Sequence, residues 1–381
     1  MQAEKNRILL NELDPVDSAI LKGLAICAIA LHNFLHFLSP VGQNEFAFQS
    51  DRFFILLDTV QHPSLAIQAL FSFFGHRGVQ IFVFLSAYGL ARSHWGDQSS
   101  WARFMSLRIR KLYPSFLLVV FFWSVLACLG SGPLSFVREF GLHLLLMFLG
   151  LSTVLGFGLP PVGPWWFIPF IVQFYALWPL LRRFAVRFGP AGLLLLSLAS
   201  LLTVYYFNPL LAHWSLNLLL TPLGHLPVLC LGILAARYPV RIPAAAGVIC
   251  SVAVIAAGRY EWLWVWAPLA ATVASLWAYV TVRSHLRNSA WLQRLGKYSL
   301  FVFLFNGIVR MLFIPFAVTP ALQLVFAFAS LACSIAIAAI FEELVMPRPR
   351  VRPIPHPILP EAIDGQRQLS QSSAETIAVA Q

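Results

Sequence analysis

The feature that most constrains this chain is a series of long apolar runs that follow one another along most of its length. A helix needs about 20 mostly apolar residues to cross the hydrocarbon core of a bilayer. Hydrophobic residues make up 59% of the 381 positions and charged residues 11%, too few for a soluble domain of this size. Membrane barrels use shorter strands of alternating polarity, whereas these runs are continuous. The sequence therefore predicts an all-α, polytopic integral membrane protein.

Eleven segments have the length and composition of a membrane helix. By residue number they are 19–38, 70–91, 113–130, 140–157, 165–181, 190–207, 217–236, 243–258, 263–282, 298–316 and 321–345. Clusters of lysine and arginine lie between them, and such clusters mark cytoplasmic loops. If residues 140–157 cross the membrane, every basic cluster from Arg182 onward falls outside. We therefore predict ten transmembrane helices with both termini cytoplasmic, and residues 140–157 as a re-entrant or interfacial segment.

The rest of the composition adds limits on domains and partners. Residues 1–346 form one membrane domain, and the Pro-rich, then small and polar, residues 347–381 are expected to form a disordered cytoplasmic tail. The net charge of +11 comes from the clusters that set topology, so no nucleic-acid partner is expected. Five cysteines without paired spacing support neither a disulfide framework nor a zinc site. We expect no metal and no bound cofactor.

Polar side chains inside the apolar segments are the candidates for function, because an ionisable group near the bilayer centre costs roughly 2.5 to 3.5 kcal/mol on insertion scales. His32 and His36 are one turn apart and share a helix face. With the predicted topology, a subset of these groups lies in the outer half or near the middle of the bilayer and could converge on one cavity: His32, His76, Arg77 and Gln173. The candidates are His32, His36, His76, Arg77, Gln173, Tyr175 and Asn306.

Structural roles compete with function at several of these positions. A buried His or Asn, such as His36 or Asn306, can simply hydrogen-bond to a neighbouring helix. Tryptophans near a segment end form aromatic belts at the interface, although Trp165 and Trp166 could also line a substrate groove. The residues that we assign to a belt are Trp165, Trp166, Trp262, Trp264 and Trp266.

A dense basic loop follows the second apolar segment and contains Arg103, Arg108, Arg110 and Lys111. It can serve topology alone, or it can bind an anionic cytosolic ligand, because arginine forks match phosphate oxygens. A nucleotide-bearing donor such as coenzyme A fits the second interpretation. The chain contains no phosphate loop of the form GxxxxGK[ST], so ATP-driven chemistry is unsupported.

Five motifs in order resemble acyltransferase family 3, the polytopic membrane O-acyltransferases that modify carbohydrates in bacterial envelopes. They are ILKGLAICAIALHNF, GHRGVQIFVFLSAYGLARS, RIRKLYP, WWFIPFIVQFYALWPLL and LGKYSLFVFLFNG. The chain departs from the family pattern at a few positions. Lys22 and His32 are ten residues apart rather than eleven, Gln173 replaces a usual Glu, and Asn306 replaces a common His. These departures narrow the expected catalytic equipment to His32.

The resemblance implies transfer of an acyl group, acetyl first among the candidates, from acyl-coenzyme A to a hydroxyl of an envelope carbohydrate or lipid-linked sugar. It places the protein in the bacterial cytoplasmic (inner) membrane. His32 and Arg77 are expected to be catalytic, and the basic loop to bind the donor. We expect acceptor binding or oxyanion support from His36, His76, Trp166, Gln173, Tyr175 and Asn306. The alternatives are a transporter or flippase of a lipid-linked sugar or small metabolite, and a purely structural membrane subunit.

Overall fold

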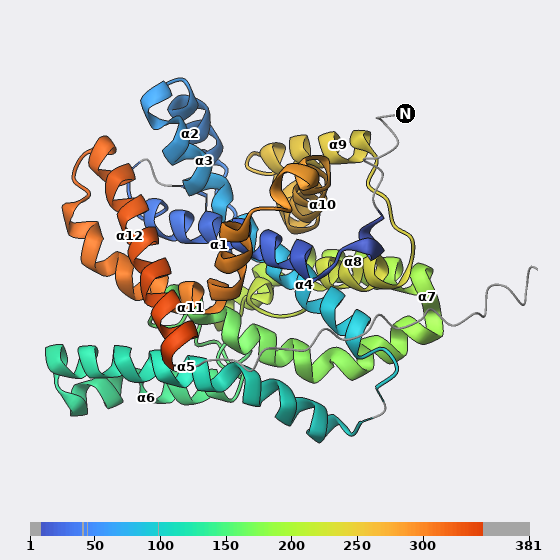
Figure 1. Ribbon diagram of the computed structural model, residues 1–381, viewed down its shortest axis with the longest axis horizontal. Coiled ribbons are helices and arrows are strands. Elements are labelled where there is room, and N and C mark those ends of the chain that lie inside the picture. Colours follow the sequence, from blue (N-terminus) through green and yellow to red (C-terminus); the bar gives the residue numbers. More distant parts are fainter. Residues whose placement is uncertain (1–8, 40–41, 44, 98, 346–381) are drawn as a thin grey trace, which may run out of the picture. The chain divides into compact units, whose positions relative to one another are not determined.

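The computed structural model describes residues 9–39, 42–43, 45–97 and 99–345, so the predicted tail lies outside the described residues. The described part is helical and contains no β-strand. Its α-helices are α1 (Pro15–Leu35), α2 (Asp51–Val60), α3 (Ala66–Phe74), α4 (Gly78–Ser93), α5 (Trp101–Ser131), α6 (Pro133–Phe148), α7 (Phe167–Leu211), α8 (Leu226–Arg237), α9 (Ala244–Ala256), α10 (Glu261–Leu286), α11 (Ala290–Phe313) and α12 (Pro320–Ile340) (Figure 1).

Seven helical stretches in the described residues are long and apolar enough to cross a membrane. This confirms the predicted class, an all-α polytopic membrane protein. The predicted count of ten differs from seven for two reasons. Two predicted segments, 165–181 and 190–207, belong to one stretch, Gly163–Trp214, and two others contain only the short apolar helices α8 and α9.

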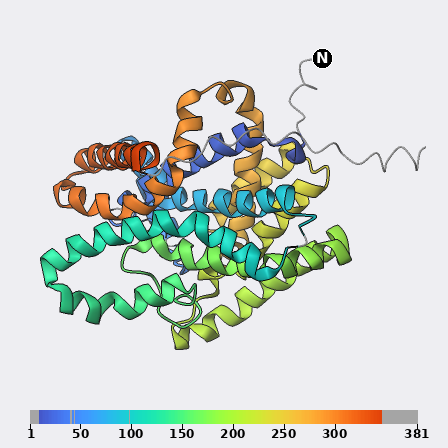
Figure 2. The ribbon, with the colours of Figure 1, turned by 60° about the horizontal axis from the view of Figure 1, so that its bottom comes forward.

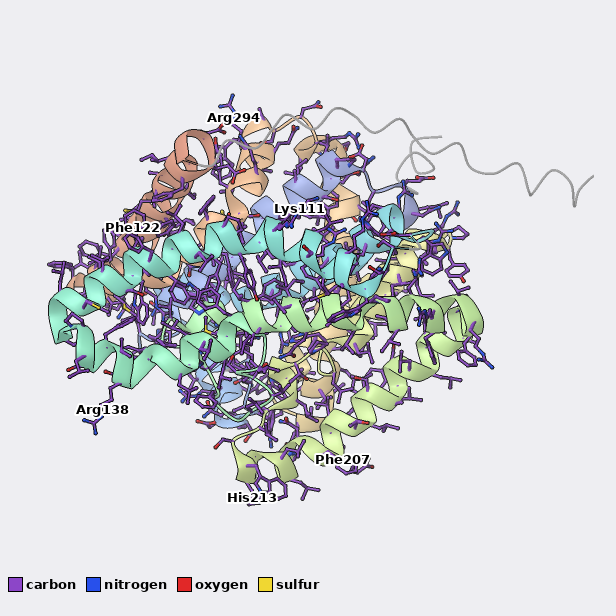
Figure 3. The ribbon with its side chains drawn as sticks, turned by 90° about the horizontal axis from the view of Figure 1, so that it is seen from below. Lys111, Phe122, Arg138, Phe207, His213 and Arg294 are labelled. Carbon is purple, nitrogen blue, oxygen red and sulfur yellow. The ribbon has the colours of Figure 1, made fainter. Side chains whose placement is uncertain are left out.

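The long helix α7 is bent between the two segments that the sequence separated. Gly189 has φ 60° and ψ −156°, a backbone conformation that a side chain disfavours, and Pro190 follows it. Figure 3 shows the two arms meeting at a sharp bend, with the second arm running towards Phe207 and His213. The stretch of 52 residues is more than twice the length that one crossing needs, so each arm is long enough for a pass of its own.

Residues 140–157, the segment that we exclude from the crossings, do not form one continuous helix. α6 ends at Phe148, and the residues after it form turns. α5 and α6 lie side by side as a hairpin (Figure 2), and the Tyr113 hydroxyl of α5 donates to the Phe148 carbonyl. Gly156, further along, lies against Trp214 just beyond α7. α6 is not among the seven stretches, and its re-entrant placement stays a prediction.

Helix α1 packs against α11, α4, α3 and α12 (Figure 1). Glycines allow the closest of these approaches, as small residues do between membrane helices. A Cβ on Gly296 of α11 would lie 1.9 Å from the Ala19 carbonyl oxygen, and one on Gly23 would lie 2.6 Å from that of Leu292. The side chains of α1 are therefore held in a fixed relation to α11.

The start of α1 is fixed by charge. Asp17 is fully buried and accepts hydrogen bonds from Arg283 Nε at 2.7 Å and from the Tyr279 hydroxyl at 2.7 Å, both on α10. Asp14 caps α1 and pairs with Arg287. Because a buried carboxylate is expensive to leave unpaired, this network determines how α1 sits against α10.

Candidate functional site

Three histidines meet near the end of α1. The rings of His32 and His36 stack with their centroids 4.8 Å apart, and the ring of His76 lies 4.9 Å from that of His32. His32 and His76 are 4% and 2% exposed. The sequence predicted the shared face of His32 and His36 from their spacing and the approach of His76 to His32, and the fold brings the three rings together.

A glycine explains how His76 comes so close to α1. Gly75 begins a short 3-10 turn, Gly75–Arg77, between α3 and α4. A Cβ on Gly75 would lie 2.5 Å from the Ala28 carbonyl oxygen and 2.8 Å from the His32 Cβ, both on α1. Only a residue without a side chain allows this backbone to approach α1 so closely.

The hydrogen bond of His32 determines which of its nitrogens is available. His32 Nδ1 lies 3.2 Å from the carbonyl oxygen of Phe71. A carbonyl oxygen only accepts, so Nδ1 carries the proton and donates it, and the neutral ring presents an Nε2 lone pair. His76 differs from His32 in this respect. Neither of its buried ring nitrogens has a hydrogen-bond partner among the described residues.

Arg77 follows His76 and is 9% exposed. It lines a cavity of about 20 Å³, room for a single water molecule, together with Gln43 and Trp264. Arg77 Nε, both polar atoms of the Gln43 amide and Trp264 Nε1 are buried without a hydrogen-bond partner in the described part of the chain. Trp264 is only 6% exposed, so its assignment to an aromatic belt is wrong, whereas Trp262 and Trp266 are exposed.

Trp166 is also buried, at 2% exposure, and Trp165 at 0%, so the belt assignment fails for both. Trp165 Nε1 donates to the Leu304 carbonyl at 2.9 Å. The Trp166 ring stacks on His225, with centroids 5.7 Å apart, and His225 Nδ1 lies 3.1 Å from Gln80 Oε1. The apolar neighbours of these tryptophans are protein rather than the membrane surface.

Glu45 is an acid that the sequence analysis did not select. It lies in the loop between α1 and α2, near Arg77 and Trp166. Phe46, the next residue, packs edge-on against Trp166, and its carbonyl accepts a hydrogen bond from Asn217 at 2.9 Å. Burial raises the pKa of the Glu45 carboxyl to about 8, although Arg77 and Trp166 act in the opposite direction.

Asn306 and Arg310, one turn apart on α11, lie behind the histidines. Asn306 Oδ1 accepts a hydrogen bond from Asn33 Nδ2 at 2.8 Å. Arg310 donates to the Asn33 carbonyl at 2.7 Å and lies over the Phe37 ring, 4.4 Å from its centroid. Asn306 therefore bonds across to a neighbouring helix, the structural role that the sequence analysis left open.

Gln173 does not bond to the histidines, which corrects the expectation that it shares their cavity. Gln173 Nε2 donates to the Gly150 carbonyl at 2.7 Å and to Thr153 Oγ1 at 2.8 Å, in the loop after α6. The Tyr175 ring lies 5.9 Å from the guanidinium carbon of Arg108. Gln173 thus holds the α6–α7 loop, and Tyr175 belongs to the basic region.

The four basic residues of α5 differ in exposure and in their partners. Arg103, Arg110 and Lys111 are exposed, and Lys111 is seen at the surface in Figure 3. Arg108 is half-buried and its Nη2 lies 2.6 Å from His94 Nε2. Burial, with Arg108 and Lys111 nearby, lowers the pKa of His94, so its neutral ring can accept a hydrogen bond from Arg108.

Sequence reasoning missed His225, Arg310 and Glu45 for different reasons. His225 and Arg310 are ionisable residues inside predicted membrane segments, so the rule that selected His32 would have found them. Glu45 lies in a connecting loop, where a carboxylate carries no such signal. In the described residues no group of three or more His, Cys, Asp or Glu could hold a metal ion.

The arrangement defines a membrane-embedded helical protein with a buried polar site built on α1 and the start of α4. The model of a family described as an acyltransferase domain matches residues 16–343. The chain therefore belongs to acyltransferase family 3, and it is an acyltransferase that transfers groups other than aminoacyl groups. No curated protein and no solved structure matches it.

Proposed function

We propose that this membrane acyltransferase moves an acyl group, acetyl first among the candidates, from acyl-coenzyme A to a hydroxyl of an envelope carbohydrate or lipid-linked sugar. The observation that carries the proposal is the state of His32. Its Nδ1 is engaged by the Phe71 carbonyl, and its Nε2 is left as an acceptor in a buried cluster that continues to Arg77.

In this mechanism His32 is the general base. The acceptor hydroxyl gives its proton to His32 Nε2 while its oxygen attacks the thioester carbonyl carbon. The carbonyl π electrons move to oxygen and form a tetrahedral oxyanion. When the intermediate collapses, the C–S bond breaks, and the imidazolium returns the proton to the departing coenzyme A thiolate. The Phe71 carbonyl holds the ring and favours the imidazolium that forms in between.

Arg77 supplies positive charge for the oxyanion. Its guanidinium is buried, and its Nε has no hydrogen-bond partner among the described residues. A pre-oriented cation in a site that excludes water contributes more to an oxyanion than it would in bulk solvent. Glu45 lies close enough to oppose this effect when it is ionised, and its raised pKa keeps it mostly neutral at pH 7.

We place the donor at the cytoplasmic end of α5. Arg108 is turned towards Tyr175 and His94, while Arg103 and Arg110 are exposed and free to meet phosphate oxygens. Replacing Arg108 and Arg110 together by Gln should raise the KM for acyl-coenzyme A. If the double variant changes only membrane orientation, these residues serve topology instead.

The decisive experiment uses purified protein in nanodiscs with labelled acetyl-coenzyme A and isolated cell-envelope glycan. We expect labelled glycan from the wild type and none from His32→Ala at equal protein abundance. His213→Ala is the matched control, because His213 is exposed at the end of α7 (Figure 3) and should retain full activity. Full activity of His32→Ala would overturn the assignment of His32. Transport of a sugar without any labelled product would favour the flippase alternative.

A further inference from the structure

The site contains a second buried arginine that the proposed mechanism does not use. Arg310 is 8% exposed, comparable to Arg77 at 9%. Its one hydrogen bond in the described residues runs from Nη1 to the Asn33 carbonyl, at 2.7 Å. No carboxylate oxygen of the described residues lies within 4.0 Å of its guanidinium. Most of its donors are therefore left for another group.

A buried guanidinium without an acid nearby destabilises the fold, because no opposite charge offsets the desolvation free energy of the cation. Arg310 packs on Phe37, with 4.4 Å between the guanidinium carbon and the ring centroid. This cation–π contact offsets only part of the desolvation free energy. An anion that binds here would supply both the missing charge and the missing acceptors. The structure therefore points to a ligand rather than to a purely structural arginine.

The groups around Arg310 strengthen this conclusion. His32 and His36 on α1 both lie within its electrostatic range, and neither carries negative charge. Arg52 of α2 also lies near His36, and its own acid, Asp51, is 3.9 Å away with a side chain that is 70% exposed. Among the described groups at this end of α1, the cations and neutral rings outnumber the exposed Asp51 carboxylate, which favours an anion.

The guanidinium faces a residue without a side chain. Gly163 is the residue opposite, and a Cβ there would have only Arg310 Nη2 within 4 Å, at 3.8 Å. Phe37, on which Arg310 packs, is 59% exposed. In the predicted topology this end of α1 faces the outer side, where the acceptor is presented, whereas the phosphates of the donor lie at the other end.

We propose that the acceptor carries an anionic group, a carboxylate or a phosphate, and that Arg310 binds this group beside His36 while His32 acts on a neighbouring hydroxyl. Arginine suits this task, because its planar fork donates two parallel hydrogen bonds to either group. The inference rests on the proposed function, since it names the class of acceptor for the same site.

A binding experiment tests it without any need for turnover. Wild-type protein in nanodiscs is titrated calorimetrically with three probes: methyl glucoside, methyl glucuronide and methyl glucoside 6-phosphate. We expect at least one anionic probe to bind about tenfold or more tightly than the neutral one, as charge-assisted hydrogen bonds allow. The stronger of the two anionic probes then identifies the anion as carboxylate or phosphate.

Variants show whether Arg310 is responsible. Arg310→Gln should abolish the preference, and Arg310→Lys should retain part of it, which also covers the case in which the Gln variant does not fold. Arg259→Gln is the control, because Arg259 is exposed and lies over Phe54 and Tyr260. Equal binding of the three probes by the wild type, binding of none of them, or a preference that survives in Arg310→Gln would each overturn the inference. Failure of the proposed function would appear separately, as absence of labelled glycan in the acyl-transfer assay.

Discussion

Gly75→Ala should damage the site, because Gly75 begins the turn that carries His76 and Arg77 against α1. The added Cβ would lie 2.5 Å from the Ala28 carbonyl oxygen and 2.8 Å from the His32 Cβ. Neither atom is the end of a flexible side chain, so the turn that carries His76 and Arg77 must move away from α1. Overpacking of this kind costs about 1 to 3 kcal/mol of stability.

The effect on catalysis should exceed the effect on stability. A displacement of about 1 Å in a positioned group can lower the rate on the order of 100-fold, and the contact that must be relieved is of that size. We therefore expect an acyl-transfer kcat reduced by about two orders of magnitude, in a protein whose thermal midpoint in nanodiscs falls by only a few degrees.

Gly89→Ala is the matched control. Gly89 lies in α4, and a Cβ there would meet nothing within 4 Å. Since alanine favours a helix over glycine by about 1 kcal/mol, this variant should be as stable as the wild type or more so, with unchanged activity. Equal activity of Gly75→Ala and Gly89→Ala would refute the claim that the turn is positioned by its contact with His32.

Three further predictions follow from the contacts around the site. Gln173→Glu should lower the thermal midpoint without raising acyl transfer. A carboxylate cannot donate a hydrogen bond to the Gly150 carbonyl, so two acceptors face each other and the protein loses about 1 to 3 kcal/mol of stability. A gain in kcat would show that the carboxylate is catalytic at this position. Acyl transfer should fall as pH rises through about 8, since Glu45 then ionises beside Arg77, and Glu45→Gln should remove that fall; an identical pH–rate profile in the variant would contradict this. Asp17→Asn should lower the thermal midpoint strongly, because Arg283 then loses its buried charged partner, which costs about 3 to 5 kcal/mol of stability. Asp51→Asn is the control, because Asp51 is exposed and its replacement should leave the midpoint unchanged.

The sequence by itself determined the class of the protein. Helices and closed barrels both satisfy their backbone hydrogen bonds in lipid, and the long continuous apolar runs select the helices. Periodicity also placed His32 and His36 on one face, and the ordered motifs indicated the family. These are local or compositional properties, so they can be inferred from a single sequence without knowledge of the tertiary contacts.

Only the tertiary structure decided which polar residues meet. Gln173 was expected to share a cavity with His32, yet it holds the loop after α6. Trp166 and Trp264 looked interfacial in sequence but are buried. Glu45 lies in the site because its loop comes close to Arg77 and Trp166, and Arg310 lies there because α11 packs onto α1. The physical reason is that the rotation of each helix about its axis is set by close contacts with its neighbours, such as that of Gly75 with Ala28, and such contacts leave no periodic trace in the sequence.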